Sequence, residues 1–174
     1  NPLNTFETNT LGTINILEAV RRYNKKIVLV IVTSDKCYEN IEKVSPYKEH
    51  HKLGGKDPYS ASKASAEITF KSYVETYFKN QKKIKASTVR AGNVIGGGDW
   101  SSYRLIPDCM KSANSNQKIL IRNSTSTRPW QHVLEPLNGY LVLGLHLFIE
   151  DKYVINESFN FGSNKFKKIT VKKL

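Results

Sequence analysis

Cysteine and histidine are scarce in this sequence of 174 residues, which contains two cysteines and four histidines. The two thiols, Cys37 and Cys109, do not make a disulfide framework, and no spacing of cysteine and histidine suits zinc. We interpret both as idle thiols of a reducing cytoplasm and expect no metal site. The longest apolar runs, 27–32 and the mixed stretch 140–149, are too short to span a bilayer, so we expect no membrane segment.

Two phosphate-binding motifs are also missing. The glycine-rich stretch 92–98 is not a P-loop, because no Gly-Lys-Ser or Gly-Lys-Thr follows it. Nor does the chain contain a Gly-x-x-Gly-x-x-Gly turn after a first strand, the motif that holds a dinucleotide pyrophosphate. The chain begins with Asn-Pro and without methionine, so we expect it to be an internal piece of a longer protein.

Acidic residues are fewer than basic ones, and the formal net charge is +12. Such a charge is compatible with a nucleic acid or a phosphorylated substrate as partner. The basic residues gather at 21–26, 79–85 and 165–173, which are expected helix ends and surface turns, where cations suit the helix dipole. Because no nucleic-acid-binding module is recognisable, we interpret the charge as a solvated basic surface and expect no nucleic-acid partner.

Strand-like and helix-like stretches alternate along the chain, as is typical of the α/β class with a parallel sheet. The stretch 27–33 is apolar without alternation, which predicts a strand buried on both faces. We expect the apolar helix 134–149 to be buried on most sides. The predicted helices are 4–23, 58–79, 104–113, 134–149 and the start of one at 170–174, and the predicted strands are 27–33, 84–91, 118–121 and 158–162.

Tyr59 and Lys63 lie at the start of the helix 58–79, which opens with Pro58, a residue that fits a first helical turn. Residues four apart share one face of a helix. A lysine ammonium near a phenol stabilises the phenolate and so lowers the phenol pKa, which makes a tyrosine able to take a proton from an alcohol. The motif alone is weak, because a chain with this many tyrosines and lysines contains about one such pair by chance.

Polar residues begin where the buried strand ends, at Thr33, Ser34, Asp35 and Lys36. Ligands of open α/β sheets bind at this end of the strands, although aspartate and serine also favour an ordinary turn here. On the residues alone both interpretations stay open. The long polar stretch 39–57 that follows is typical of a lid or binding loop.

The order of these pieces resembles the extended short-chain dehydrogenase/reductase family of nucleotide-sugar enzymes, over nearly the whole chain. The stretches 33–38, 92–100, 104–108 and 128–136 are most similar to its CDP-glucose 4,6-dehydratase branch. The resemblance implies a partial Rossmann-like, doubly wound parallel sheet and part of a smaller substrate-binding region. We expect the first in residues 1–103, without its glycine-rich N-terminal half, and the second in 104–174, with an interleaved boundary.

The activity that the resemblance implies is that of an NAD-dependent but redox-neutral lyase. CDP-glucose would be oxidised at C4, lose water across C5 and C6, and regain the hydride at C6 to give CDP-4-keto-6-deoxyglucose. The dTDP-glucose dehydratases resemble this pattern but have Asp-Glu where this chain has Asp35-Lys36, which favours the CDP-glucose branch. A dTDP-glucose 4,6-dehydratase, a 4-epimerase and a non-catalytic basic Rossmann module remain alternatives.

The resemblance also implies roles for single residues. Tyr59 would deprotonate the C4 hydroxyl, Lys63 would assist it and bind the nicotinamide ribose, and Ser34 or Thr33 would hold the C4 oxygen. Asn9 corresponds to the family's asparagine behind the catalytic tyrosine, and it joins Tyr59, Lys63 and Thr33 as expected contacts of NAD.

The resemblance implies that elimination of water would fall to Asp35, as the acid at C6, and to Lys36, as the base at C5. Among the remaining candidates, the resemblance implies that Asn93 contacts the substrate pyrophosphate. Trp100 belongs to the same expected substrate contacts, and the cations Arg104 and Arg128 would meet the phosphates. We further expect a cytoplasmic homodimer of the complete protein, formed by the helices 4–23 and 58–79, and no activity of this piece alone.

Overall fold

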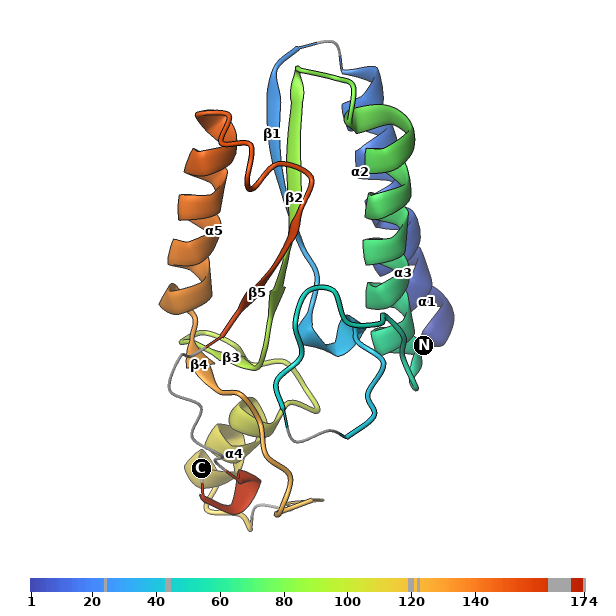
Figure 1. The fold of residues 1–174 in the computed structure, drawn as a ribbon. Helices are drawn as coiled ribbons and strands as arrows, with labels where there is room; N and C mark the ends of the chain where they lie inside the picture. Colours follow the sequence, from blue (N-terminus) through green and yellow to red (C-terminus); the bar gives the residue numbers. More distant parts are fainter. Residues whose placement is uncertain (24, 43–44, 119–120, 122, 163–169, 174) are drawn as a thin grey trace. The chain divides into compact units, whose positions relative to one another are not determined.

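A parallel sheet forms where the strands are predicted, with the order β1-β2-β5 (Figure 1). β1 (Ile27–Val32) pairs with β2 (Ile84–Ala91), which pairs with β5 (Ser158–Phe161). All three strands run in the same direction, so their carboxyl ends meet at one edge. The computed structural model describes residues 1–23, 25–42, 45–118, 121, 123–162 and 170–173. It confirms the predicted α/β class with a parallel sheet.

The chain divides into two units, each built from two segments. The larger unit comprises Asn1–Ala91 and Asn138–Phe161, and it contains the three-stranded sheet. The smaller unit comprises Gly92–Leu137 and Gly162–Leu174.

Helices cover both faces of the sheet in the larger unit (Figure 1). On one face lie α1 (Pro2–Phe6), α2 (Gly12–Arg22) and α3 (Pro58–Tyr73). A π-helical turn, Glu7–Leu11, joins α1 to α2, and a second one, Val74–Phe78, extends α3. The predicted helices 4–23 and 58–79 are therefore each one continuous helical segment with a local change of hydrogen bonding. The core of this face is formed by Leu17, Val20, Phe70, Val74, Phe78, Ile84 and Ala86.

The opposite face is covered by α5 (Leu134–Phe148), and the expectation that this helix is buried on most sides is wrong. Its buried apolar residues, Leu143 and Leu147, pack with Val89. Leu141 and Phe148 are 76% and 74% exposed, and Leu134, Leu137, Val142 and Leu145 are exposed as well. A sequence with apolar residues on every side of a helix is typical of a helix that is buried all round. In the described part of the larger unit, however, only one stripe of α5 packs against the sheet, and its other apolar residues are exposed.

The smaller unit holds α4 (Leu105–Asn114), close to the predicted helix, and a 3-10 turn, Val171–Lys173, where a helix start is predicted. Two strands of two residues each, β3 (Val94–Ile95) and β4 (Gln131–His132), pair in parallel. Strands this short leave no periodic pattern in a sequence. The predicted strand 118–121 includes residues 119 and 120, which lie outside the described residues, as does residue 174.

None of the helices in the described residues is long and apolar enough to cross a membrane.

Candidate active site

The segment after β1 turns sharply into a short 3-10 helix, Asp35–Cys37. Ser34 is extended, with φ −165° and ψ 152°, and its hydroxyl oxygen accepts a hydrogen bond from the Lys36 amide at 3.2 Å. The same hydroxyl donates to Asp35 Oδ1 at 3.1 Å. Serine is a favoured residue at such a helix start, so the turn and the polar chemistry use the same side chain. Asp35 is half-buried and Lys36 exposed beside the carboxyl end of the strand.

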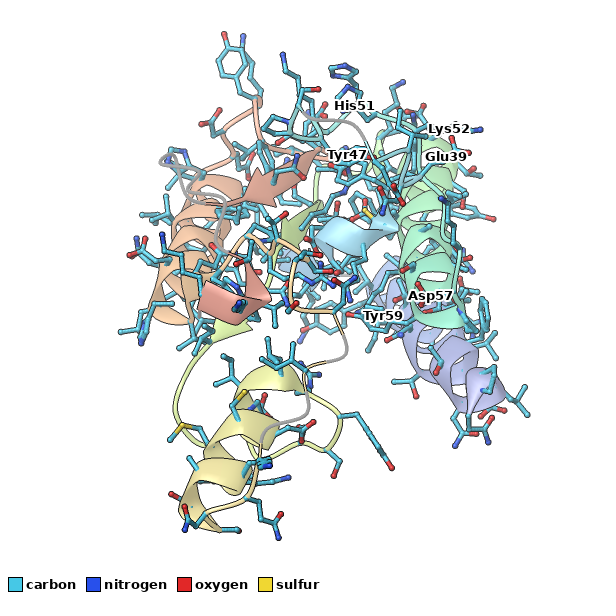
Figure 2. The ribbon with its side chains drawn as sticks, turned by 90° about the horizontal axis from the view of Figure 1, so that it is seen from below. Glu39, Tyr47, His51, Lys52, Asp57 and Tyr59 are labelled. Atoms are coloured by element: carbon cyan, nitrogen blue, oxygen red, sulfur yellow. The ribbon has the colours of Figure 1, made fainter. Side chains whose placement is uncertain are left out.

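The start of α3 is held by Asp57, whose carboxylate accepts hydrogen bonds from the amides of Tyr59, at 3.0 Å, and Ser60, at 3.1 Å. The Ser60 hydroxyl donates to the same carboxylate at 2.6 Å. These bonds, those from Ser60 first, lower the pKa of Asp57. Figure 2 shows Asp57 and Tyr59 together at this end of α3. The cap fixes Tyr59 in the first helical turn, with 42% of its surface exposed.

Tyr59 and Lys63 share one face of α3, as predicted from their spacing. Lys63 is half-buried, and burial lowers the pKa of its ammonium group while the carboxylate of Glu67 opposes that change. A third group joins them from the strand end, because Lys36 Nζ lies 5.7 Å from the centre of the Tyr59 ring. The structure therefore brings the β1 end and the tyrosine of α3 to one place.

Asn9 lies behind the turn that carries Tyr59. Its side-chain amide donates to Ser62 Oγ at 3.0 Å, and Ser62 donates to the carbonyl of Tyr59 at 2.8 Å. Asn9 belongs to the first π-helical turn, and Thr13 donates to its carbonyl at 2.7 Å. Asn9 thus supports the backbone of Tyr59 through Ser62.

Thr33 points away from the exposed residues that follow it. Its hydroxyl donates to Glu67 and lies 3.1 Å from the carbonyl oxygen of Val89, and its own amide donates to that carbonyl at 2.8 Å. Thr33 is buried, as is Ser34. Of the two residues expected to hold the C4 oxygen, Ser34 is therefore the one whose hydroxyl contacts Asp35 and the Lys36 amide.

A buried ion pair lies beneath these residues, and the sequence alone did not reveal it. Glu67 and Arg90 are 2.6 Å apart, with side chains 1% and 4% exposed. Burial works against the charged guanidinium, but the hydrogen bond and charge of Glu67 raise the pKa of Arg90. Arg90 Nη1 also donates to the Tyr38 hydroxyl at 2.7 Å. The available signal was a carboxylate at position 67, four residues after Lys63 on the same helical face.

The long loop 39–57 is held against this pair. Arg90 donates to the carbonyl of Glu49 at 3.0 Å, and the ring of Tyr47 stacks on that of Tyr38 at 5.2 Å. Figure 2 shows Tyr47 and His51 near each other in this loop, with Glu39 and Lys52, which form an ion pair of 3.0 Å. The loop therefore has defined contacts.

Neither cysteine takes part in a cluster that suits a metal. Cys37 is fully buried, and burial raises the pKa of its thiol to about 12, which agrees with an idle thiol. Within the described residues, no three side chains of His, Cys, Asp or Glu are placed to hold a metal ion.

In the smaller unit, two of the four predicted substrate contacts line the same hollow. Asn93 and Arg128 border a space of about 520 Å³, together with Tyr103 and Trp130. Arg104 immediately precedes α4 and is exposed, as is Trp100, and neither lines that hollow. In the glycine run 96–98, Gly98 adopts a left-handed backbone conformation with φ +80°, which glycine accommodates without strain.

A model of the GDP-mannose 4,6-dehydratase family matches residues 1–174, the whole chain. The chain belongs to this family. It is 46% identical over 165 residues to CDP-glucose 4,6-dehydratase of Salmonella typhimurium, covering 92% of this chain and 46% of the relative. These matches confirm the resemblance to nucleotide-sugar dehydratases that the sequence motifs indicated.

Solved structures agree with this assignment. The dTDP-glucose 4,6-dehydratase of Bacillus anthracis, in complex with NAD, is 29% identical, with a TM-score of 0.74 over 94% of this chain and 49% of that one. An epimerase from Methanothermobacter thermautotrophicus shares the fold, with a TM-score of 0.81 at 22% identity over 98% of this chain and 48% of that one. The chain therefore spans about half the length of these relatives.

We predict that Asp57→Ala lowers the free energy of unfolding by about 1 kcal/mol at pH 7, because it removes the cap of α3. The pKa of Asp57 is lower in the folded chain than in the unfolded one. Its contribution is therefore fully present above about pH 5 and is lost as the pH falls through the lowered pKa. Urea unfolding of the wild-type protein and of Asp57→Ala, at several pH values between 7 and 3, measures the difference in their free energies of unfolding.

Asp57→Asn is the control, because asparagine caps helices about as well and does not titrate in this range. An Asp57→Ala deficit that is equally large at pH 3 and pH 7 would contradict an ionised cap.

Proposed function

We propose that the complete protein is an NAD-dependent nucleotide-sugar 4,6-dehydratase that converts CDP-glucose to CDP-4-keto-6-deoxyglucose. The observation that carries the proposal is the approach of Lys36, in the turn that also carries Asp35, to Tyr59, on the helix that also carries Lys63, within one unit. The 46% identity to a CDP-glucose 4,6-dehydratase supports this substrate. A hydro-lyase of this class needs a base at C4 and an acid–base pair for elimination, and these residue types are present.

The residues around Tyr59 suit a nicotinamide nucleotide. Lys63 is a half-buried cation one turn after an exposed phenol, and Asn9 supports that turn through Ser62. We propose that Tyr59 and Lys63 contact NAD and that Asn9 supports them through Ser62. The expected contact of Thr33 with NAD is not kept, because its buried hydroxyl is bonded to Glu67 and lies close to the Val89 carbonyl. When bound, NAD would supply the acceptor and later the donor of a hydride.

The first proton transfer falls to Tyr59. Its phenolate would take the proton of the C4 hydroxyl, and the positive charge of Lys63 favours that phenolate. Ser34 would turn its single hydroxyl hydrogen from Asp35 to the C4 oxygen when the sugar binds, because its hydroxyl lies at the strand end and its backbone is fixed by the 3-10 turn.

Elimination then requires one group that gives a proton and one that takes one. Asp35 in its protonated form would protonate the departing C6 hydroxyl, and Lys36 in its uncharged form would take the C5 proton, which the C4 ketone has acidified. Lys36 lies close to the Tyr59 ring, so both steps can act on one sugar. This division between Asp35 and Lys36 is part of the proposal.

The smaller unit is proposed to bind the nucleotide part of the substrate. Arg128 and Asn93 line one hollow with Tyr103 and Trp130, a combination of a cation, an amide and aromatic rings that suits a nucleoside diphosphate. Arg104 and Trp100 complete the proposed set without lining that hollow.

We further propose that the sheet continues beyond β1 in the complete enzyme. β1 is apolar on both faces, yet among the described residues its outer edge has no partner strand, and Val32 is 52% exposed. The relatives are about twice as long as this chain. The larger unit would then be part of the NAD-binding region and the smaller one part of the substrate-binding region, in a cytoplasmic enzyme.

We predict that the 174-residue chain alone neither binds NAD tightly nor turns over CDP-glucose, because no glycine-rich turn for the pyrophosphate is present in its sequence. Isothermal calorimetry with NAD measures this directly. Tight binding by the isolated chain would contradict the proposed division of the cofactor site.

The helices α2 and α3 are proposed to form the interface of a homodimer. They pack against each other and still leave Ile68 exposed on α3, and Leu11 is exposed in the π-helical turn before α2. We predict a dimer of the complete protein in light scattering at micromolar concentration, and a monomer would contradict the interface. Ile68→Glu should weaken the dimer, whereas Lys79→Glu, at an exposed position after α3, should not.

The competing functions differ in the product. A dTDP-glucose dehydratase would act on the other nucleotide sugar, and a 4-epimerase would not need the pair Asp35 and Lys36. A basic Rossmann module without catalysis would bind nucleic acid in a salt-sensitive way and no nucleotide sugar.

We predict that the complete enzyme, incubated with CDP-glucose and NAD, forms a 4-keto product that is detected by its absorbance in alkali. Tyr59→Phe should lower kcat by about 100-fold or more, since it removes the proton acceptor. Tyr23→Phe is the control, because Tyr23 is an exposed tyrosine at the end of α2. Product from dTDP-glucose and none from CDP-glucose would overturn the choice of substrate.

A further inference from the structure

Glu67 is a buried carboxylate that connects α3 to all three strands of the sheet. It is 2% exposed and accepts hydrogen bonds from Arg90 at 2.6 Å and Thr88 at 2.9 Å, both on β2. Ser158 of β5 donates to it at 3.3 Å, and Thr33 donates to it from the end of β1. A carboxylate with four donors satisfies the hydrogen-bonding capacity of its two oxygens.

The position of Glu67 on α3 links this network to the proposed catalytic residues. It lies four residues after Lys63 and eight after Tyr59, on the same helical face. Thr33, at its other side, immediately precedes Ser34 and Asp35. One side chain is thus attached both to the helix that carries the proposed base and to the segment that carries the proposed acid.

We propose that Glu67 is a positioning residue of the dehydratase reaction, which holds the segment 33–36 in place against Tyr59 and Lys63. This inference rests on the proposed function, because it concerns the same site. Glu67 does not contact the substrate in this role. It acts through Thr33 on the strand end and through its negative charge on Lys63, whose ammonium group it favours.

The partner of Glu67 has a separate set of contacts. Arg90 donates to the Tyr38 hydroxyl and to the carbonyl of Glu49, and so holds the loop 39–57. Removing Glu67 alone leaves Arg90 buried and without its countercharge, which destabilises the fold. Replacing both partners removes that penalty, and this separates a positioning role from a contribution to stability.

The test compares Glu67→Gln with the double variant Glu67→Gln/Arg90→Met in the complete enzyme. We expect Glu67→Gln to lower both the melting temperature and kcat, with kcat falling about 100-fold and KM changing by less than about threefold. The double variant should regain most of the melting temperature but keep the low kcat. Glu75→Gln, an exposed carboxylate paired with Lys79 in the same helical segment, should change neither.

Recovery of kcat together with the melting temperature in the double variant would overturn the proposal, because the pair would then serve stability alone. If Glu67→Gln does not fold, the double variant decides together with amide exchange, because Arg90→Met also removes the contacts of Arg90 with Tyr38 and Glu49. Low kcat together with faster exchange at residues 33–37 supports positioning, and wild-type kcat or unchanged exchange there overturns it.

Amide hydrogen exchange provides a measurement that is independent of the substrate. We expect faster exchange at residues 33–37 in the double variant than in the wild type, without any ligand present. Unchanged exchange there would overturn the positioning role, whatever the enzyme acts on. Failure of the wild-type enzyme to act on CDP-glucose would instead overturn the proposed function. The exchange result would then still test whether Glu67 holds residues 33–37 in place.

Discussion

The buried pair of Glu67 and Arg90 is the interaction on which the arrangement of the larger unit depends. Two charges removed from water are tolerated only when they are paired and their remaining hydrogen-bonding groups are satisfied. The hydroxyls of Thr33, Thr88 and Ser158 meet that requirement on the side of Glu67. Because these donors come from β2, from the first residue of β5 and from the residue after β1, α3 cannot slide along the sheet without breaking several bonds at once.

The proposed chemistry follows from this constraint. Fixing α3 against the sheet fixes Tyr59 and Lys63, and fixing Thr33 fixes the turn that begins at Ser34. Proton transfer needs donor and acceptor within hydrogen-bonding reach, so a rigid connection between two separate segments is a physical requirement for a shared site. The approach of Lys36 to the Tyr59 ring is the visible result.

Much of the fold could be predicted from local patterns. The continuous apolar stretch 27–33 became β1, and 84–91 became β2 with the same bounds. Pro58 marks the start of α3, where Asp57 supplies a cap, and such signals act over a few residues. The strand β3 escaped prediction because it has two residues, whereas the sequence of 128–133, which contains β4, indicates a turn or strand edge. The exposure of α5 escaped prediction because the pattern of an apolar helix does not reveal how much of it meets a neighbour.

The candidate site could likewise be predicted only in part. The spacing of Tyr59 and Lys63 is a local signal, whereas the pairing of Glu67 with Arg90 joins residues 23 apart and becomes visible only in the folded chain. The same holds for Thr33, whose hydroxyl is directed to Glu67 rather than to the exposed strand end. A sequence pattern states which residue types are present, and three-dimensional contacts decide which neighbour each of them has.

We propose that the complete enzyme removes water from a sugar rather than inverting the configuration at one carbon. The most direct measurement is the reaction of the complete enzyme with CDP-glucose and NAD in deuterium oxide, followed by nuclear magnetic resonance of the product. Removal of the C5 proton by a residue in contact with solvent, and return of the C4 hydrogen to C6, predict a 4-keto-6-deoxy product with deuterium at C5 and the original C4 hydrogen at C6. A C4 epimer that keeps its C6 hydroxyl and carries no deuterium at C5 would contradict the dehydratase assignment.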